Sequence, residues 1–485
     1  MVIIWRFPVE QNEIYYKAML SRDYRFDGKF YVAVKTTGIY CRPICPAKPK
    51  LENIVFFNDS FSAEKAGYRP CLRCHPEFSP DYPVWPGKSP IVQKALLLIS
   101  QNGMFETDME TFAEQLNVSS RHLRRLFEDE VGLSPKQISD LHRLNFAYKL
   151  IKETQLKLTE VALTSGFNSL RRFNDAFKKR YHYPPRFIRK SKSIKSENVF
   201  TLHIAYRPPL DWNNLLHYFL RHQIPFVEKV SDSTYERVFK EKSSIGVFTV
   251  ENDESKAQLT IKVFCQDPKV LFPVVNRIRK MFDINSDPLL IGNQFSLFPF
   301  LQKLWEEFPG LRIARGWDPF EIAVGTILGQ VISVKQASNL MGQLVENYGE
   351  VIHHPLTNEK TFLFPTPEVL SKASLEEIKT TSQRKDAIRQ LSQAIFNKEI
   401  SFGEYQNPND FKQHLKKIKG IGSWSAEYIS LRGLGDTNAF PKDDLVLNKA
   451  LKSIGHHFNS DQIAPWQGYL AIYLWKKYVK KEEKT

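Results

Sequence analysis

Between residues 91 and 187 the apolar positions recur with helical spacing, and one arrangement occurs twice. In the first copy, a helix over residues 109–116 is followed by a polar turn and a second helix that begins at Ser120. A connecting helix over residues 138–152 leads to the second copy, which turns at Gly166. Glycine suits such a turn because it adopts a positive φ without steric cost. Each copy therefore predicts a helix–turn–helix.

After residue 200 the pattern changes from helical spacing to the alternation of apolar and polar residues that is typical of strands. Three strands are predicted, at residues 200–206, 245–250 and 258–264, and two helical stretches separate them, at 212–223 and 268–282. From Pro299 onward the pattern is nearly all helical. This change predicts a small unit of strands and helices followed by a helical domain.

Two segments without periodicity divide the chain further. Residues 79–87 are rich in proline, which cannot continue a helix, and residues 190–196 are basic and rich in serine, as linkers are. The boundaries that we predict are 1–80, 86–190, a linker at 191–199, 200–288 and 289–485.

Composition agrees with several globular domains and indicates the kind of partner. A chain of 485 residues is too long for one core, and 42% hydrophobic residues suffice to bury several. The net charge of +15 favours nucleic acid or another anionic surface. No apolar run approaches the length of a membrane span, and the first residues do not form a signal peptide. We expect a cytoplasmic monomer that does not associate with membranes.

Four of the five cysteines form two close pairs, Cys41 with Cys45 and Cys71 with Cys74. Two pairs of thiolates on two turns are what tetrahedral Zn²⁺ requires, so we expect one zinc ion there. Arginines flank these cysteines, at positions 42, 69 and 73, and a zinc site that meets a phosphate would need such charge, whereas a purely structural one would not. The fifth cysteine, Cys265, lies in a predicted strand, and we interpret it as an unreactive core residue.

The strings TTGIYCRP-C and RPC-RC around these cysteines resemble the N-terminal domain of the Ada adaptive-response proteins. This resemblance implies that Cys41 accepts a methyl group from a DNA methylphosphotriester, in a single turnover, and that the other three cysteines complete the site. The ion would be both structural and nucleophile-activating. Methylation of Cys41 would remove one negative charge beside Arg42, Arg69 and Arg73, and so strengthen DNA binding.

The second helix–turn–helix, with the string VALTSGFNS followed by FKK and YPPRF, resembles the signature half of AraC-type regulators. His182 stands near the position where the family usually has a glycine. The resemblance implies binding to successive major-groove faces of DNA. Five arginines on the second helices are the expected DNA contacts: Arg121, Arg124, Arg125, Arg171 and Arg172.

A second decisive string, KGIGSWSAEY, joins two predicted helices through Gly420 and Gly422. Two glycines allow a tight turn that exposes backbone N–H groups to a phosphate. Such a turn alone is common, but here the acidic pair Asp443 and Asp444 follows, with Asp444 twenty positions after Trp424.

This combination, with PPLDW, ILGQVISV and APWQGY, resembles the helix–hairpin–helix DNA glycosylases of the AlkA type. The resemblance implies that Asp444 stabilises an oxocarbenium-like sugar while the glycosidic bond breaks. Trp424, Tyr428 and Trp466 would form the aromatic walls of the base pocket, and Val331 the wedge that replaces a flipped nucleotide.

Two further expectations follow from the residues that are absent. Trp424 stands where bifunctional relatives have a Schiff-base lysine, so a monofunctional glycosylase without lyase activity is expected. The iron–sulfur cysteines of some relatives are missing, so no iron–sulfur cluster is expected.

The sequence thus predicts a multidomain fold: a small α/β zinc domain, an all-α tandem helix–turn–helix domain, and an α+β domain followed by an all-α helix–hairpin–helix glycosylase domain. The predicted function is DNA alkylation repair, with removal of bases such as 3-methyladenine, combined with methylation-responsive transcriptional activation. Partners would be double-stranded DNA, alkylated or promoter, and RNA polymerase. Two alternatives stay open: a repair enzyme without a regulatory role, and a transcription factor with an inactive glycosylase-like module.

Overall fold

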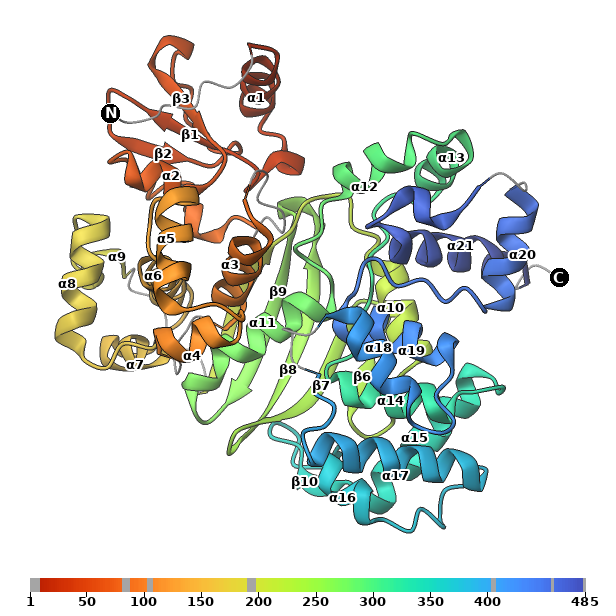
Figure 1. Cartoon of the computed structure of the whole chain (residues 1–485). Coiled ribbons are helices and arrows are strands. Elements are labelled where there is room, and N and C mark those ends of the chain that lie inside the picture. The colour runs from red at the N-terminus through yellow and green to blue at the C-terminus, as the bar shows by residue number, and fades with distance from the viewer. Residues whose placement is uncertain are drawn as a thin grey trace. The chain divides into compact units, whose positions relative to one another are not determined.

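The computed structural model describes residues 9–80, 88–102, 108–189, 198–402, 407–454 and 458–482. Contacts divide the chain into two compact units (Figure 1). The first comprises residues 1–208, 253–276 and 284–287, and the second comprises the remainder. Most of the predicted proline-rich segment and the serine-rich linker, as well as the extreme N-terminus, lie outside the described residues.

The first unit begins with a helix and a four-stranded sheet in the order β3-β1-β2-β4. The elements are α1 (Val9–Ser21), β1 (Tyr31–Val34), β2 (Ile39–Cys41), β3 (Ile54–Phe57), α2 (Ser60–Lys65) and β4 (Arg69–Pro70). Strand β1 pairs antiparallel with β2 and β3, while β2 and β4 are parallel. Alternate residues of β1 face opposite sides, so Val32 packs with Phe30 and Tyr15 while Tyr31 packs with Tyr40.

Seven helices follow, and they contain the two predicted helix–turn–helix units. They are α3 (Pro90–Asn102), α4 (Met109–Glu114), α5 (Ser120–Glu130), α6 (Pro135–Glu153), α7 (Leu158–Thr164), α8 (Leu170–Tyr181) and α9 (Pro185–Ile188). Ser119 and Ser169 cap α5 and α8 by accepting backbone N–H groups. Gly166 has φ +80°, which confirms the expected positive φ at this turn. His182 caps α8 at φ +61°, so the residue near the family's usual glycine has the left-handed conformation that glycine favours.

Two strands complete the first unit. Strands β5 (Val199–Ala205) and β9 (Gln258–Cys265) pair antiparallel, with Phe200 opposite Val263. Cys265 is fully buried at the end of β9, and burial raises the pKa of its thiol to about 12. Because only the thiolate is reactive, this position agrees with the interpretation of Cys265 as an inert core residue.

The second unit begins with α10 (Trp212–Arg221) and three antiparallel strands: β6 (Glu228–Val230), β7 (Thr234–Glu241) and β8 (Ser244–Asp253). The sequence predicts only β8 of these three. In β7 the inward-facing position between Tyr235 and Phe239 is occupied by Arg237. Its side chain is buried, and its guanidinium contacts the carboxyl groups of Glu228 and Glu321. A charged residue at an inward position breaks the alternation on which the prediction depends.

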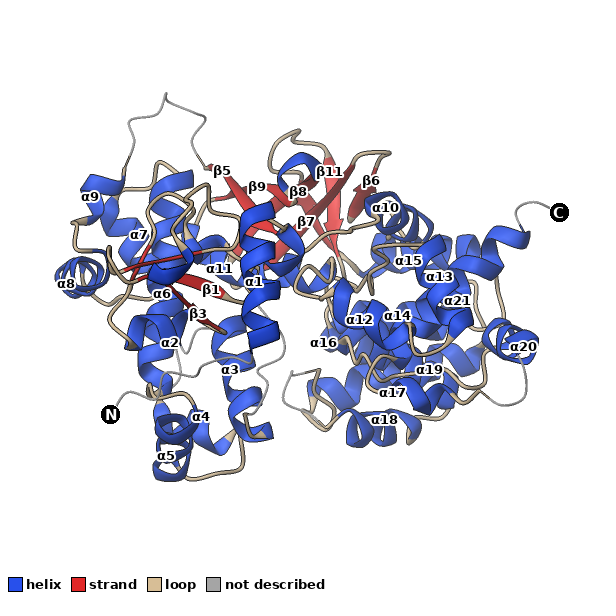
Figure 2. Cartoon of the chain, turned by 90° about the horizontal axis from the view of Figure 1, so that it is seen from above, coloured by secondary structure: helices blue, strands red, loops and turns tan. Residues whose placement is uncertain are grey.

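Helices dominate the rest of the second unit, as predicted (Figure 2). Helix α11 (Leu271–Met281) belongs partly to each unit. The helices after it are α12 (Pro288–Phe295), α13 (Pro299–Glu307), α14 (Pro319–Leu328), α15 (Val334–Tyr348), α16 (Pro367–Lys372), α17 (Ser382–Phe396), α18 (Pro408–Lys416), α19 (Ser423–Ile429), α20 (Leu445–Ile454) and α21 (Gln467–Glu482). A short antiparallel hairpin of β10 (Glu350–His353) and β11 (Lys360–Leu363) interrupts them, and the sequence analysis does not predict it. Within the described residues, no helix combines the length and the apolarity that crossing a bilayer demands.

Candidate functional site

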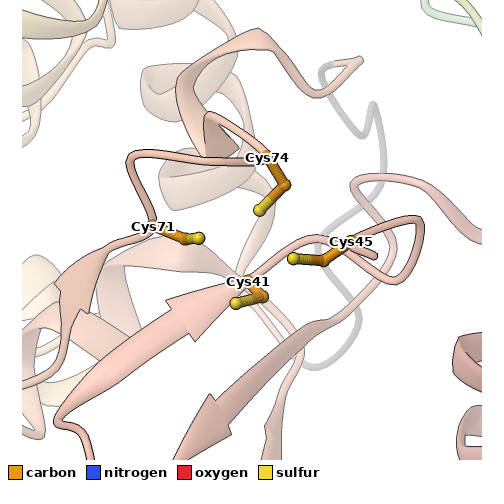
Figure 3. A group of neighbouring side chains, drawn as sticks. All are labelled: Cys41, Cys45, Cys71 and Cys74. Atoms are coloured by element: carbon orange, nitrogen blue, oxygen red, sulfur yellow. The ribbon is translucent and has the colours of Figure 1, made fainter. Parts of the chain in front are cut away.

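The four paired cysteines meet at one point of the first unit. Cys41 ends β2, Cys45 lies in the loop after it, and Cys71 and Cys74 lie in the loop after β4. The parallel pairing of β2 with β4 brings the two loops together, and the backbone N–H of Cys71 donates to the carbonyl of Tyr40. The four sulfur atoms lie within 4.8 Å of one another and turn toward a common centre (Figure 3).

The electrostatics of this cluster call for a cation. Hydrogen bonds with Cys45 and Cys71 raise the pKa of Cys41, and hydrogen bonds with the other three sulfurs raise the pKa of Cys74. The same contacts lower the pKa of Cys45 and Cys71, so without a cation two of the four thiols hold protons that a metal would displace. Ideal tetrahedral bonds of about 2.3 Å place sulfur atoms roughly 3.8 Å apart, so the cluster fits zinc.

The four sulfurs differ in the hydrogen bonds that they accept from the backbone. The N–H of Arg42 donates to Cys74 Sγ over 3.3 Å, and the N–H of Arg73 donates to Cys71 Sγ over 3.4 Å. In the described part of the chain no backbone N–H donates to Cys41 Sγ. A sulfur without such donors keeps more of its electron density for attack on an electrophile.

The arginines near the cluster fall into two groups. Arg42 is buried and forms a bidentate ion pair with Asp27, and its Nη1 donates to the carbonyl of Cys74 over 3.3 Å. This placement argues against the direct phosphate contact expected for Arg42, because its guanidinium is already fully engaged in holding the loop. Arg73 is exposed and Arg69 is half-buried, so both remain available to a ligand.

The helix–turn–helix arginines lie on the surface. Arg121, Arg124 and Arg125 are exposed on α5, and Arg171 and Arg172 are exposed at the start of α8. The opposite faces of these helices are buried through Leu123, Phe127, Phe173 and Phe177. Each helix is therefore strongly amphipathic and presents its cations to solvent.

A polar contact with little exposure to solvent joins α8 to the segment that carries the four paired cysteines. The hydroxyl of Tyr40, next to Cys41, donates to Glu64 over 2.7 Å, and the same carboxylate pairs with Arg180 over 2.7 Å. Arg180 also donates to Asn145 on α6 over 2.6 Å. The side chains of Glu64 and Arg180 are only 13% and 6% exposed. Sequence reasoning missed this contact, because no pattern relates residues so far apart in the chain.

In the second unit, α18 and α19 form the predicted helical hairpin around Gly420 and Gly422. Gly420 has φ +103°, which favours glycine, and Gly422 precedes the first residue of α19 with open space around it. The Gln330 amide donates to the Gly420 carbonyl over 2.8 Å and to Ser425 Oγ over 3.2 Å. The loop between α14 and α15 is thereby tied to the hairpin.

Val331, the predicted wedge, lies at the tip of that loop. It is 100% exposed and has φ +57°, a conformation that a β-branched residue rarely adopts. Arg384 donates to the carbonyl of the preceding Gln330 and so helps to hold this strained loop. A strained, exposed apolar side chain on a braced loop is typical of a functional position.

Asp444 immediately precedes α20, and its carboxylate accepts four hydrogen bonds. Oδ1 accepts the backbone N–H groups of Val446 and Leu447, both over 2.9 Å, in the manner of a helix cap. Two indole N–H groups complete the set: Trp424 donates to Oδ2 over 3.0 Å and Trp475 to Oδ1 over 3.3 Å. The carboxylate is therefore held in one orientation, while its neighbour Asp443 is exposed.

Aromatic rings surround this carboxylate. Trp424 stacks on Tyr428 with centroids 5.1 Å apart, and Tyr428 lies 6.0 Å from Trp475. Trp475 thus belongs to this cluster, whereas the ring of Trp466 contacts Tyr469. The prediction of Trp466 as a pocket wall follows the APWQGY string, but α21 turns Trp475 toward Asp444.

Comparison with known proteins identifies the families that the chain resembles. Three family models match: the metal-binding domain of Ada over residues 14–77, a helix-turn-helix domain over 112–191, and the AlkA N-terminal domain over 201–318. These matches confirm the three resemblances found in the sequence and agree with the predicted multidomain fold class.

Three curated relatives are similar to the chain over different lengths. A probable bifunctional transcriptional activator/DNA repair enzyme AlkA of Mycobacterium tuberculosis is 31% identical over 476 residues, which cover 95% of each chain. DNA-3-methyladenine glycosylase 2 of Escherichia coli is 27% identical over 57% of this chain and 96% of its own. The bifunctional transcriptional activator/DNA repair enzyme Ada of Escherichia coli is 38% identical over 31% of this chain and 42% of its own.

Proposed function

The chain belongs to the family of bifunctional transcriptional activator/DNA repair enzymes of the AlkA type, and from that premise we propose that it repairs alkylated DNA and activates transcription in response to alkylation. The alignment over 95% of both chains supports both roles, because it includes the metal, helix–turn–helix and glycosylase regions together. We further propose a monomer in the cytoplasm, with double-stranded DNA and RNA polymerase as partners.

The domains that we propose keep the boundaries expected from the sequence. A zinc methyl-acceptor domain spans 1–80 and a tandem helix–turn–helix domain 86–190. A linker at 191–199 leads to an AlkA-like N-terminal domain at 200–288 and a helix–hairpin–helix domain at 289–485. The matches at 14–77 and 112–191 agree with the first two of these domains, whereas the match to the AlkA N-terminal domain, at 201–318, extends past the proposed boundary at residue 288.

We propose that the second unit hydrolyses the N-glycosidic bond of alkylated bases such as 3-methyladenine. The observation that carries this is the Asp444 carboxylate, which is fixed by two indoles within an aromatic cluster. As the bond from C1′ to the base nitrogen breaks, the bonding electrons leave with the base and positive charge develops on the sugar. Asp444 stabilises that charge, and water then adds to C1′ and loses a proton.

The rings and the hairpin position the substrate in this proposal. Trp424, Tyr428 and Trp475 stack on the extruded base, and Val331 fills the gap that it leaves. Gly420 and Gly422 present backbone N–H groups to the phosphates beside the lesion. Trp424 offers no amine for a Schiff base, so the glycosylase is monofunctional.

In the first unit we propose that Cys41 accepts a methyl group from a methylphosphotriester. Zinc bound by Cys41, Cys45, Cys71 and Cys74 would supply the positive charge that keeps four sulfurs deprotonated together. Cys41 Sγ attacks the methyl carbon, the carbon–oxygen bond breaks, and the phosphodiester leaves with the bonding electrons. The thioether that forms is stable, so each chain reacts once.

This transfer also supplies the signal for transcription. Neutralising one thiolate reduces the negative charge that faces the DNA backbone, beside Arg69 and Arg73. The exposed arginines of α5 and α8 then bind promoter DNA more tightly. Arg42 supports this surface from within through Asp27 rather than by touching phosphate.

One experiment tests both roles. The protein is incubated with methylated duplex DNA, released bases are separated by chromatography, and the added methyl group is located by mass spectrometry. We expect free 3-methyladenine and a mass increase of one methyl on the peptide that contains Cys41. Released base without protein methylation would refute the methyl-acceptor role alone, and a methylated Cys41 without released base would refute the glycosylase role alone.

A further inference from the structure

Arg432 lies in the aromatic cluster beside Asp444, within a π-helical turn at residues 430–434 that follows α19. Its guanidinium carbon lies 4.2 Å from the ring centroid of Tyr218, 6.0 Å from that of Tyr428 and 5.8 Å from that of Trp475. The residue is only 5% exposed. The positively charged guanidinium of Arg432 is therefore already in contact with the rings that would stack on an extruded base.

The charge of Arg432 is permanent and is not neutralised nearby. Arginine keeps its proton at every pH relevant to proteins. In the part of the chain that the structure describes, Arg432 forms no ion pair; its Nη1 donates to the carbonyl of Ala314 over 2.9 Å, and its buried Nε–H has no partner. Burying a cation without a carboxylate partner costs free energy, so Arg432 does not owe its position to an ion pair that stabilises the fold.

Arg432 and Asp444 both contact the indole of Trp475. Trp475 donates its N–H to Asp444, and its ring lies beside Arg432. The aromatic cluster therefore contacts one negatively charged and one positively charged side chain. Breaking the glycosidic bond moves electrons toward the base and leaves positive charge on the sugar, so charges of both signs can stabilise the products as they form.

We propose that Arg432 is a specificity-determining residue that extends the glycosylase from positively charged alkylated purines to neutral damaged purines. This inference rests on the proposed glycosylase function. A cationic base becomes neutral as the glycosidic bond breaks and gains little from a nearby cation. A neutral base must take the bonding electrons as an anion, and the positive charge of Arg432 stabilises that anion as it forms.

The test compares two substrates in the same variants. Arg432→Gln removes the charge and retains a donor for the Ala314 carbonyl, while Arg432→Lys retains the charge. Duplexes contain either 7-methylguanine, which is positively charged, or hypoxanthine, which is a neutral purine. For Arg432→Gln we expect kcat/KM to fall about 30-fold for hypoxanthine and less than threefold for 7-methylguanine, as one charge at ~8 Å and an effective dielectric of ~20 implies. Arg432→Lys should keep most of the wild-type ratio.

An equal loss of kcat/KM on both substrates in Arg432→Gln would overturn the proposal, because it would show that Arg432 only supports the Ala314 loop. A measurement on the wild-type protein covers the case in which the variant does not fold. Quenching of tryptophan fluorescence should show that neutral quinoline binds at least as tightly as N-methylquinolinium. Tighter binding of the cation by tenfold or more overturns the proposal.

Failure of the proposed function gives a different result. If the wild-type protein released neither base, the glycosylase role would be refuted. The relative affinities of quinoline and N-methylquinolinium would still show whether the aromatic cluster prefers a neutral ligand to a cationic one. If the wild type releases only 7-methylguanine and hypoxanthine stays in the duplex, the glycosylase role stands and the proposal for Arg432 fails.

Discussion

Replacing Asp444 with asparagine separates the charge of this side chain from its shape. Asparagine caps helices as well as aspartate does, so its side-chain oxygen can still accept the N–H groups of Val446 and Leu447. The amide nitrogen, however, cannot accept the indole N–H of Trp424 that now donates to Oδ2 over 3.0 Å. One lost hydrogen bond to a charged group costs about 1.5–3 kcal/mol, which a large domain tolerates.

The catalytic loss should be larger than the structural one. A carboxylate about 4 Å from a developing positive charge, at an effective dielectric of about 20, stabilises it by roughly 4 kcal/mol. Each 1.36 kcal/mol corresponds to a factor of ten in rate. We therefore expect Asp444→Asn to release 3-methyladenine about a thousandfold more slowly than the wild type.

Single-turnover release of 3-methyladenine from duplex DNA measures this rate, and thermal unfolding verifies that the variant is folded. Asp443→Asn is the matched control, because Asp443 is exposed and should change the rate less than threefold. Binding to duplex DNA with an abasic site should persist in Asp444→Asn. A folded Asp444→Asn protein that releases base within tenfold of the wild-type rate would falsify the catalytic assignment.

Four other outcomes are expected. Removing metal with a chelator should lower the unfolding temperature of a fragment 1–189 in the wild type, and an unchanged temperature would argue against a bound ion. A double-mutant cycle of Glu64→Gln with Arg180→Met should give a coupling of about 1–3 kcal/mol in unfolding free energy, because the pair is nearly buried; additive effects would contradict it. Val331→Gly should raise the unfolding free energy by about 1 kcal/mol through relief of the positive φ, yet slow base release from duplex DNA; Val331→Ala, which keeps the strain, is the control. Burial outweighs the opposing positive charge of Arg237 and raises the pKa of Glu321 to about 8, above its unfolded value, so the folded state binds more protons and stability falls as pH rises from about 5 to 8. Glu321→Gln should flatten that fall in urea titrations at pH 6 and 8.5, and an equal slope in both proteins would refute it.

Local pattern was sufficient for the parts of the fold that depend on neighbours in sequence. The helical spacing around Gly166 predicted its turn and its positive φ, and the alternation at residues 258–264 predicted β9. Pattern failed at β7, because Arg237 occupies an inward position that its contacts with the carboxyl groups of Glu228 and Glu321 make tolerable. Glu228 lies in the neighbouring strand β6 and Glu321 lies 84 positions along the chain, and the alternation of apolar and polar residues reveals neither contact.

The same distinction applies to the candidate sites. Paired spacing fixed the four cysteines as ligands of one metal, since two short loops can each supply two sulfurs whatever the rest of the chain does. Spacing could not tell that Arg42 would be buried against Asp27, because exposure is decided by how β2 and its loops pack. It also could not tell Trp466 from Trp475.

By itself, then, the sequence determined which chemistry the chain carries: four thiols for a metal, basic helices for DNA, and a carboxylate after a glycine hairpin with aromatic residues nearby. These features depend on residue type and short-range spacing, and both can be read directly from the sequence. The tertiary structure alone decided which side chains share a site. It brought Trp475 to Asp444, Arg432 to Trp475 and Glu64 to Arg180, because the packing of buried surfaces selects contacts between residues far apart in the chain.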